Sequence, residues 1–114
     1  MADTPQDTAG DGHVEVVDNP AERFYELRVD GEPAGVLVYE SAGSRRVITH
    51  TVIQRGFQGR GLSGRLVRAA LDDLRARHHT VTSYCEVVDR FIEAHPEYAD
   101  LIDPEQPGAG HKGR

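Results

Sequence analysis

The sequence predicts one α+β domain built on a mostly antiparallel mixed sheet, and two observations carry this prediction. The first half of the chain alternates apolar and polar residues in short runs separated by turn residues, which is typical of hairpin-linked strands. From Leu62 onward, apolar residues recur at helical spacing, and one more β-type run precedes a second helical segment. The expected order is therefore four strands, a helix, a strand and a helix.

The four early strands are expected over residues 13–18, 23–29, 34–39 and 46–53. Asn19-Pro20 ends the first run, and Asp30-Gly31 is a strong tight-turn signal that favours a hairpin between the second and third. The fourth run is rich in β-branched residues. These pieces form an antiparallel meander, in which Ile48, His50 and Val52 are expected to share one face of the last strand.

The longer helix is expected over residues 62–77, because its leucines and valines fall on one face and its charged residues on the other. Residues 80–85 return to β-type side chains. A shorter helix runs from about residue 87 to residue 94 and ends at His95-Pro96, since proline disfavours helix in the residue before it.

The domain is expected to span residues 13–103, between two flexible tails. Residues 1–12 are small, polar and acidic, and residues 104–114 are rich in proline and glycine. One cysteine allows no intrachain disulfide and no metal site built on cysteine pairs, so no metal is expected. No apolar run is long enough to cross a bilayer, and we expect a cytoplasmic protein without a membrane partner.

The net charge of −6 is unevenly distributed. Residues 41–82 hold eight arginines against two aspartates, a net of +6, whereas residues 1–40 carry −8 and residues 83–114 carry −4. Such a field favours an anionic ligand near the positive segment. Arg55, Arg60 and Arg65 are the candidates for phosphate contacts, while Arg75 and Arg77 are expected to solvate a helix surface.

The positive segment contains the glycine-rich stretch Gln58-Gly59-Arg60-Gly61-Leu62-Ser63-Gly64, between the fourth strand and the longer helix. Glycines let the backbone approach a ligand closely, and the first turn of a helix supplies unpaired N–H donors. The stretch therefore predicts a site for a phosphorylated ligand. A dinucleotide fold would need a parallel βαβ unit, and a nucleotide P-loop would need Gly-Lys-Ser/Thr at its end. The hairpin-linked strands and the absence of that ending argue against both.

Taken with other motifs, this stretch resembles the GNAT superfamily of acetyl-CoA-dependent N-acetyltransferases. The pyrophosphate turn of that superfamily reads Gln/Arg-x-x-Gly-x-Gly/Ala, and Gln58, Gly61 and Ser63 stand at its three defining positions, with serine as a departure in the last. The chain is similar in particular to small single-domain members. That likeness rests on Thr49-His50-Thr51, on Cys85 and on the run from Phe91 to Leu101, which contains His95-Pro96-Glu97-Tyr98.

The resemblance implies an α/β/α sandwich and a binding mode for acetyl-CoA. Backbone N–H groups of residues 58–64 would hold the pyrophosphate, and backbone groups of Val52 and Ile53 would pair with the pantetheine arm. The fourth and fifth strands would splay apart to admit the acetyl thioester. An amine, either a small molecule or a protein lysine, would be the acceptor.

Acetyl transfer needs a group that takes a proton from the amine and donors for the thioester oxygen. Many members of the superfamily use a carboxylate on the strand before the turn and a tyrosine on the last helix. Here Val52 stands where relatives can have glutamate, and Phe91 or Ile92 stands about where the tyrosine is expected. Cys85 and His50 are therefore the catalytic candidates. Cys85 could accept the acetyl group as a thiolate or be a buried apolar residue, and His50 could be a base or a structural histidine.

Other aromatic and ionisable residues of the last third have simpler expected roles. His95 is explained by its position at a helix end, and Tyr84 and Tyr98 are expected to be core or rim aromatics.

The leading interpretation is an N-acetyltransferase that works as a monomer or weak homodimer. The alternative is a non-catalytic acyl-CoA-binding regulatory module, motivated by the missing acid and base. Nucleic-acid binding is disfavoured, because the termini are acidic and few aromatic residues accompany the arginines.

Overall fold

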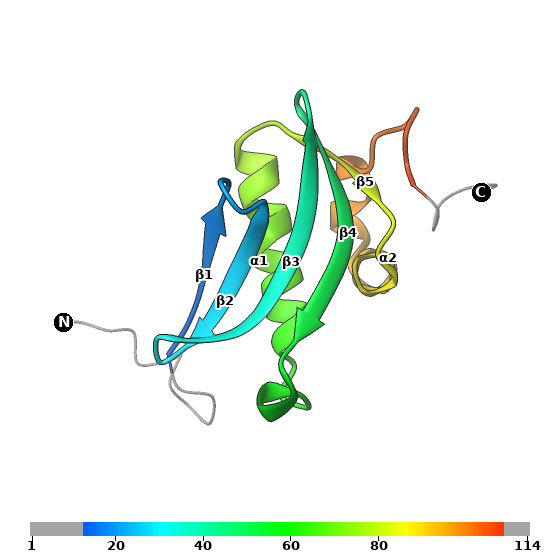
Figure 1. Ribbon diagram of the computed structural model, residues 1–114. Helices are drawn as coiled ribbons and strands as arrows, with labels where there is room; N and C mark the ends of the chain where they lie inside the picture. Colours follow the sequence, from blue (N-terminus) through cyan, green and yellow to red (C-terminus); the bar gives the residue numbers. More distant parts are fainter. Residues whose placement is uncertain (1–12, 109–114) are drawn as a thin grey trace.

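The computed structural model describes residues 13–108, so the predicted tails 1–12 and 109–114 lie outside the described residues (Figure 1). Its five strands follow one another in the sheet in chain order. The first four, which pair antiparallel, are β1 (Val14–Asn19), β2 (Phe24–Val29), β3 (Glu32–Ala42) and β4 (Arg45–Ile53). The last strand, β5 (Thr80–Ser83), runs parallel to β4. This confirms the predicted meander and the mixed sheet.

Two α-helices and two 3₁₀ helices complete the described fold. Helix α1 (Leu62–Ala76) connects β4 to β5, and α2 (Glu86–Ala94) follows β5. The 3₁₀ helices are η2 (Arg55–Phe57), before α1, and η3 (Pro96–Leu101), after α2. The predicted order of strands and helices is therefore confirmed.

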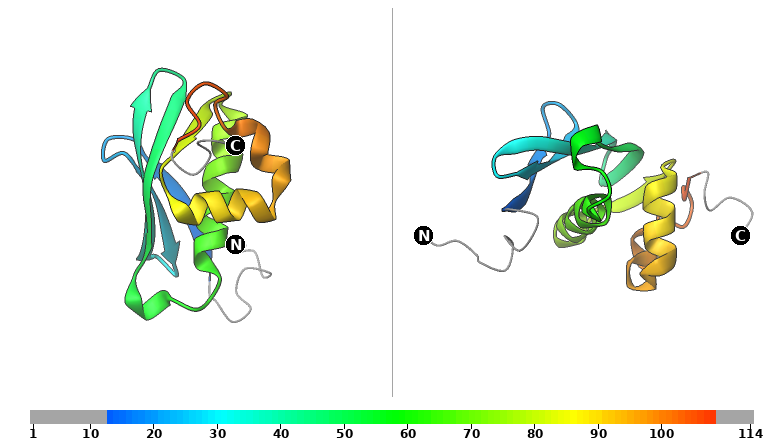
Figure 2. Two further views of the ribbon diagram at one scale, coloured as in Figure 1. Left: turned by 90° about the vertical axis from the view of Figure 1, so that its right-hand side faces the viewer. Right: turned by 90° about the horizontal axis from the view of Figure 1, so that it is seen from below.

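Both α-helices lie on the same face of the sheet (Figure 2). The α+β class is confirmed, but the described residues form two layers and not an α/β/α sandwich. The reason is that a β–α–β crossover fixes the face on which its helix lies. Helix α2 then packs beside α1, where Arg68 of α1 donates to the Tyr98 hydroxyl of η3 over 3.1 Å.

The core lies between the sheet and the two helices. Alternate strand residues point into it, including Leu27, Leu37 and Ile48, each fully buried, and they meet the apolar face of α1. That face consists of the residues at helical spacing in the sequence: Leu62, Leu66, Val67, Ala70, Leu71 and Leu74. Within residues 13–108, the structure holds no helix long and apolar enough to cross a membrane.

Strand β4 contains a bulge that changes the face of its second half. Ile48 pairs with Tyr39 and His50 pairs with Val38, so Thr49 is an additional residue without its own partner. Ile48 is consequently buried against the helices, while His50 is exposed on the opposite face. The expectation that Ile48 and His50 share a face is wrong, because a bulge breaks the two-residue period on which it rested.

Residues 102–108, called here the C-terminal strap, follow the outer edge of β5. Ile102 forms a parallel bridge with Val81, and the Ser83 N–H donates to the Pro107 carbonyl over 3.0 Å. Residues 104–108, assigned to the tail on composition, thus pack against the sheet. They satisfy β5 backbone groups that the edge would otherwise expose.

Candidate active site

Strand β5 pairs along its whole length with the first half of β4, and the second half of β4 extends beyond it. Pairing ends where Ile48 lies opposite Ser83, and the Tyr84 N–H closes it with a 2.9 Å hydrogen bond to the Ile48 carbonyl. Beyond this point residues 49–53 of β4 have no β5 partner, because β5 ends and the chain turns into α2. We call this region, between the unpaired half of β4 and the chain that leaves β5, the splay. It begins next to the Thr49 bulge of β4, and the separation expected of these strands over the cofactor stays a prediction.

The splay exposes one edge of the β4 backbone. The Gln54 N–H donates to the Ala34 carbonyl over 2.8 Å. In an antiparallel pair, backbone groups of successive residues point alternately toward and away from the partner strand, so this bond shows which β4 residues bond to β3. Val52, two residues earlier, therefore directs its backbone groups to β3. The N–H and C=O groups of Thr51 and Ile53 point instead toward the open edge. Of the expected pair Val52 and Ile53, only Ile53 presents its backbone to the splay.

The glycine-rich turn lies where this open edge ends. Gln58 ties the turn to the strand, since its side-chain amide donates to the Ile53 carbonyl over 3.0 Å. Gly61 is the N-cap of α1 in the left-handed region, with φ of 72°, a conformation that favours glycine. The cap has no side-chain hydrogen bond and the first turn holds no acidic residue. The first-turn N–H groups of α1 therefore face outward without a side-chain acceptor from their own helix.

There is room above the turn for a close ligand. A Cβ atom added at Gly59, Gly61 or Gly64 would meet no other atom of the described residues within 4 Å. Arg60 is exposed nearby, with its guanidinium 5.3 Å from the centre of the Phe57 ring. A turn of this kind, with outward N–H groups and a cationic neighbour, suits a phosphate group.

A pocket of about 340 Å³ continues from the turn between the two helices. Ser63, Gly64 and Val67 line it from α1, and α2 with its C-cap contributes the opposite wall: Val87, Arg90, Phe91, Ala94 and His95. The rings of Phe91 and His95 lie 4.3 Å apart. The pocket thus combines an aromatic wall with a helix N-terminus.

Cys85 lies on the inner wall of the splay. Its Sγ atom is 3.2 Å from the Thr51 Oγ1 atom of β4, a contact in which either group can donate. The cysteine is only 5% exposed, and its backbone N–H donates a hydrogen bond to the Ser83 hydroxyl oxygen over 3.3 Å. The structure therefore brings Cys85 to Thr51. The sequence does not indicate this contact, because an uninterrupted strand would turn Thr51 outward and only the bulge turns its side chain inward.

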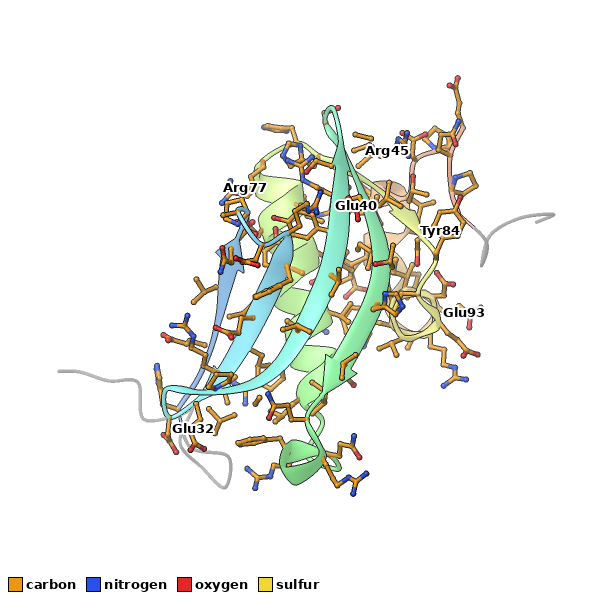
Figure 3. All side chains as sticks on the ribbon, in the orientation of Figure 1. Glu32, Glu40, Arg45, Arg77, Tyr84 and Glu93 are labelled. Carbon is orange, nitrogen blue, oxygen red and sulfur yellow. The ribbon has the colours of Figure 1, made fainter. Side chains whose placement is uncertain are left out.

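His50 is not brought together with Cys85. Its side chain emerges on the helix-free face of the sheet, next to the 52% exposed Val52. Tyr84, which is 56% exposed, lies at the end of β5 beside the same opening (Figure 3). The two catalytic candidates thus stand on opposite sides of the splay, the thiol toward the helices and the imidazole toward solvent.

Helix α2 and η3 are fastened to α1 by a cluster of polar side chains around Tyr98. The buried Tyr98 hydroxyl donates to Asp72 Oδ1 over 2.7 Å, and burial together with this bond raises the pKa of Tyr98. Arg68 stacks 5.3 Å from the Phe91 ring and lies 3.4 Å from His95 Nδ1. This confirms a core role for Tyr98 and gives His95 a position beside the pocket.

The fold and site define a class of protein: a mixed sheet in which the fourth strand extends beyond the fifth and leads into an open helix N-terminus. The family model described as GCN5-related N-acetyl-transferase matches residues 24–101. The chain therefore belongs to this family within the GNAT superfamily, as the resemblance of its motifs implied.

Comparison with known proteins gives the same result. Protein NATD1 of Bos taurus is 34% identical over 91 residues, covering 72% of this chain and 76% of that protein. Protein NATD1 of Mus musculus is 30% identical over 102 residues, covering 82% of this chain and 88% of that protein.

Two solved structures share the fold. One is a GCN5-like putative N-acetyltransferase from Staphylococcus aureus, with a TM-score of 0.56, 15% identity and coverage of 88% and 96% of the two chains. The other is the ribosomal-protein-S18-alanine N-acetyltransferase from Escherichia coli, with a TM-score of 0.54, 14% identity and coverage of 83% and 61%.

Proposed function

We propose that the protein is an acetyl-CoA-dependent N-acetyltransferase that acts on a primary amine. The observation that carries this proposal is the continuity of the open β4 edge with the uncapped N-terminus of α1. An acyl-CoA is a long polyanion with an amide-bearing arm, and it needs strand-like hydrogen bonds next to a phosphate site. The single cysteine fits a reducing compartment such as the cytoplasm.

In this proposal the backbone N–H groups of residues 58–64 hold the diphosphate, with Arg60 nearby. The backbone groups of Thr51 and Ile53 pair with the pantetheine amides. The open space over Gly61 and Gly64 fits such a close approach, since side chains there would obstruct it. Bound acetyl-CoA supplies the activated acetyl group as a thioester.

The acceptor amine approaches from the helix-free face in this proposal. His50 and Tyr84 are exposed on that side of the splay, so His50 is placed to take the proton that the amine must lose. Cys85 stands on the other wall, beside Thr51. Two routes follow from this geometry: direct attack by the amine with His50 as base, or transfer through an acetylated Cys85 thiolate.

A matched pair of variants at Ser63 tests the binding site. Ser63 lies in the first turn of α1 and lines the pocket, so Ser63→Glu adds a negative charge where the helix dipole favours it and where a phosphate must lie. By isothermal titration calorimetry, Ser63→Glu should weaken coenzyme A binding by about tenfold or more, with no fall in thermal midpoint. Ser63→Ala is the control and should retain binding. Equal affinity in both variants would place the cofactor elsewhere.

Turnover is tested by thiol release from acetyl-CoA with a panel of primary amines. Intact mass after acetyl-CoA treatment, compared between the wild type and Cys85→Ala, separates the two routes. A single acetyl group that disappears with Cys85→Ala supports the covalent route, and a rate lowered only by His50→Ala supports direct attack.

A non-catalytic acyl-CoA-binding module is the second candidate. It is favoured by the side chain of Val52, which is 52% exposed and has no titratable group at the place where the resemblance implies that relatives can have glutamate. Tight coenzyme A binding without thiol release for any amine would support this second function.

A further inference from the structure

The two edges of the sheet differ in how their backbone groups are paired. At the β5 edge the C-terminal strap forms the Ile102–Val81 bridge, and the Ser83 N–H donates to the Pro107 carbonyl over 3.0 Å. Strand β1 forms the opposite edge and pairs only with β2 in the part of the chain that the structure describes (Figure 1). Because an edge strand carries a row of unpaired N–H and C=O groups, β1 is a place where another strand can pair.

Every second residue of β1 directs its backbone groups to this free edge. The Asp30 N–H donates to the His13 carbonyl over 2.7 Å, so His13 and every second residue after it face β2. The N–H and C=O groups of Val14, Val16 and Asp18 therefore point away from β2. The strand contains no proline, and its pairing with β2 runs without a bulge along the whole strand. The free edge is thus regular over its length.

The helix side of the free edge has room for the side chains of an added strand. A cavity of about 490 Å³ lies there, lined by Val16 and Asp18 of β1 and by Ala69, Asp73 and Arg77 of α1. Helix α1 therefore does not fill the space beneath β1. Side chains alternate between the two faces of a strand, so every second side chain of an added strand would point toward this cavity.

We propose that β1 pairs with the β1 strand of a second copy of this chain, antiparallel and centred on Val16. This inference does not depend on the proposed acetyltransferase function. The two-fold pairing places Val16 opposite its own counterpart. Val14 then lies opposite the partner's Asp18, and Glu15 lies opposite the partner's Val17. Residues with outward backbone groups meet one another and exchange hydrogen bonds. The two sheets become one continuous sheet, with the helices of both copies on the same face.

Charge and backbone donors favour this register over the other symmetric ones. Centring the pairing on Glu15 or on Asp18 would place two carboxylates of like charge directly opposite each other. Centring it on Val17 would extend the ladder to the partner's Pro20, which has no N–H to donate. Centring it on Val16 avoids both, and it packs the 37% exposed side chain of Val17 against a second strand. Strand β1 is thus complementary to itself in this register.

Sedimentation equilibrium of the full chain tests the pairing. From about 5 µM to about 500 µM it should show monomer and dimer in exchange, because one strand pair is smaller than a standard interface. Val16→Pro removes an outward N–H and no bond to β2, so it should raise the dimer Kd by about tenfold or more.

Val16→Ala is the matched control for this variant. It loses the same side-chain contacts but keeps the N–H, so it should dimerise more tightly than Val16→Pro. Thermal midpoints verify that both variants are folded. A monomer at every concentration, or the same Kd for both variants, would overturn the proposal.

A disulfide tests the register in the Cys85→Ala background, where an introduced thiol is the only one in the chain. In the proposed register the two Val16 Cα atoms lie about 5.5 Å apart, a separation that a disulfide can bridge. With oxidised glutathione, Val16→Cys should form a disulfide-linked dimer. Asn19→Cys is the control, because its side chain is more exposed than that of Val16 but the register separates its two copies by roughly 20 Å. Linkage at residue 19 as fast as at residue 16, or none at residue 16, would overturn the proposal.

Discussion

Two buried tyrosines of the sheet each tie two elements together through a single hydroxyl group. Tyr25 donates to Asp73 of α1 and Tyr39 donates to Asp18 of β1, each over 2.6 Å. Burial, followed by these bonds to carboxylates, raises the pKa of both tyrosines, that of Tyr39 to about 12. The alternating pattern of β2 predicts that Tyr25 faces inward with Leu27 and Val29. It cannot reveal Asp73, which lies 48 residues further along the chain.

Tyr39→Phe should make the free energy of unfolding fall less steeply as the pH rises above 10. The pKa of Tyr39 is higher in the folded chain than the ordinary value of 10.0, so its contribution is complete below about pH 10. It is lost as the pH rises through about 12, because the unfolded chain releases the proton first. Urea denaturation at pH 8 and pH 11 should show a shallower decline for Tyr39→Phe. At pH 8 this variant should be less stable by about 1 kcal/mol. Tyr25 contributes with the same sign, so some decline remains. Identical declines in both proteins would contradict the assignment.

Most of what the sequence predicts correctly concerns single helices, strands and turns. The strand, glycine turn and helix N-terminus follow from local signals, and each is observed close to its expected bounds. The Thr49 bulge was not predicted, because no turn residue marks it and its cause is the pairing of β4 with β3. The faces of His50 and Thr51, and thus the separation of the two catalytic candidates, depend on that pairing.

Helix α1 should show a conflict between stability and binding at Gly64. A glycine in a helix is less favourable than alanine, and a Cβ at Gly64 would meet no described atom within 4 Å. Gly64→Ala should therefore raise the free energy of unfolding by about 0.5–1 kcal/mol. The added methyl group enters the pocket beside Ser63, so coenzyme A affinity should fall roughly threefold or more. Denaturation and calorimetry measure the two effects.

Ala69→Gly is the matched control on the same helix. Ala69 lies on the β1 side of α1, beside Val16 and Tyr25, away from the turn. It should lower stability and leave coenzyme A affinity unchanged. Gly64→Ala with unaltered affinity would show that the ligand does not contact the first turn.

The molecule as a whole has one covered and one open sheet face. The sandwich expected from the superfamily fails because the described residues supply only the helices that follow β4 and β5, and these share a face. The alternation of β2 already favours one covered face, since strands covered on both faces are apolar nearly throughout. The charge distribution was also readable from the sequence: the arginine-rich segment contains the glycine turn, between two acidic segments.

This distribution predicts a salt-dependent affinity for coenzyme A. Raising NaCl from about 50 mM to about 500 mM shortens the screening length and should weaken binding several-fold. Pantetheine, which has the arm without the phosphates, should bind more weakly and with little dependence on salt. Calorimetry of both ligands at the two salt concentrations makes the comparison. Equal salt dependence for both would mean that the positive segment does not contact the phosphates.

Thr49 has a consequence that reaches beyond its own contacts. Thr49 is the one residue of β4 without a partner in the β3–β4 ladder at this point. If it were deleted, Ile48 would still face inward, His50 outward and Thr51 inward, as in a regular strand. What such a deletion would remove is the local bend and twist that a bulge gives a strand, at the point where β4 passes the end of β5. The face to which each β4 side chain points and the shape of β4 at the splay are thus separable properties.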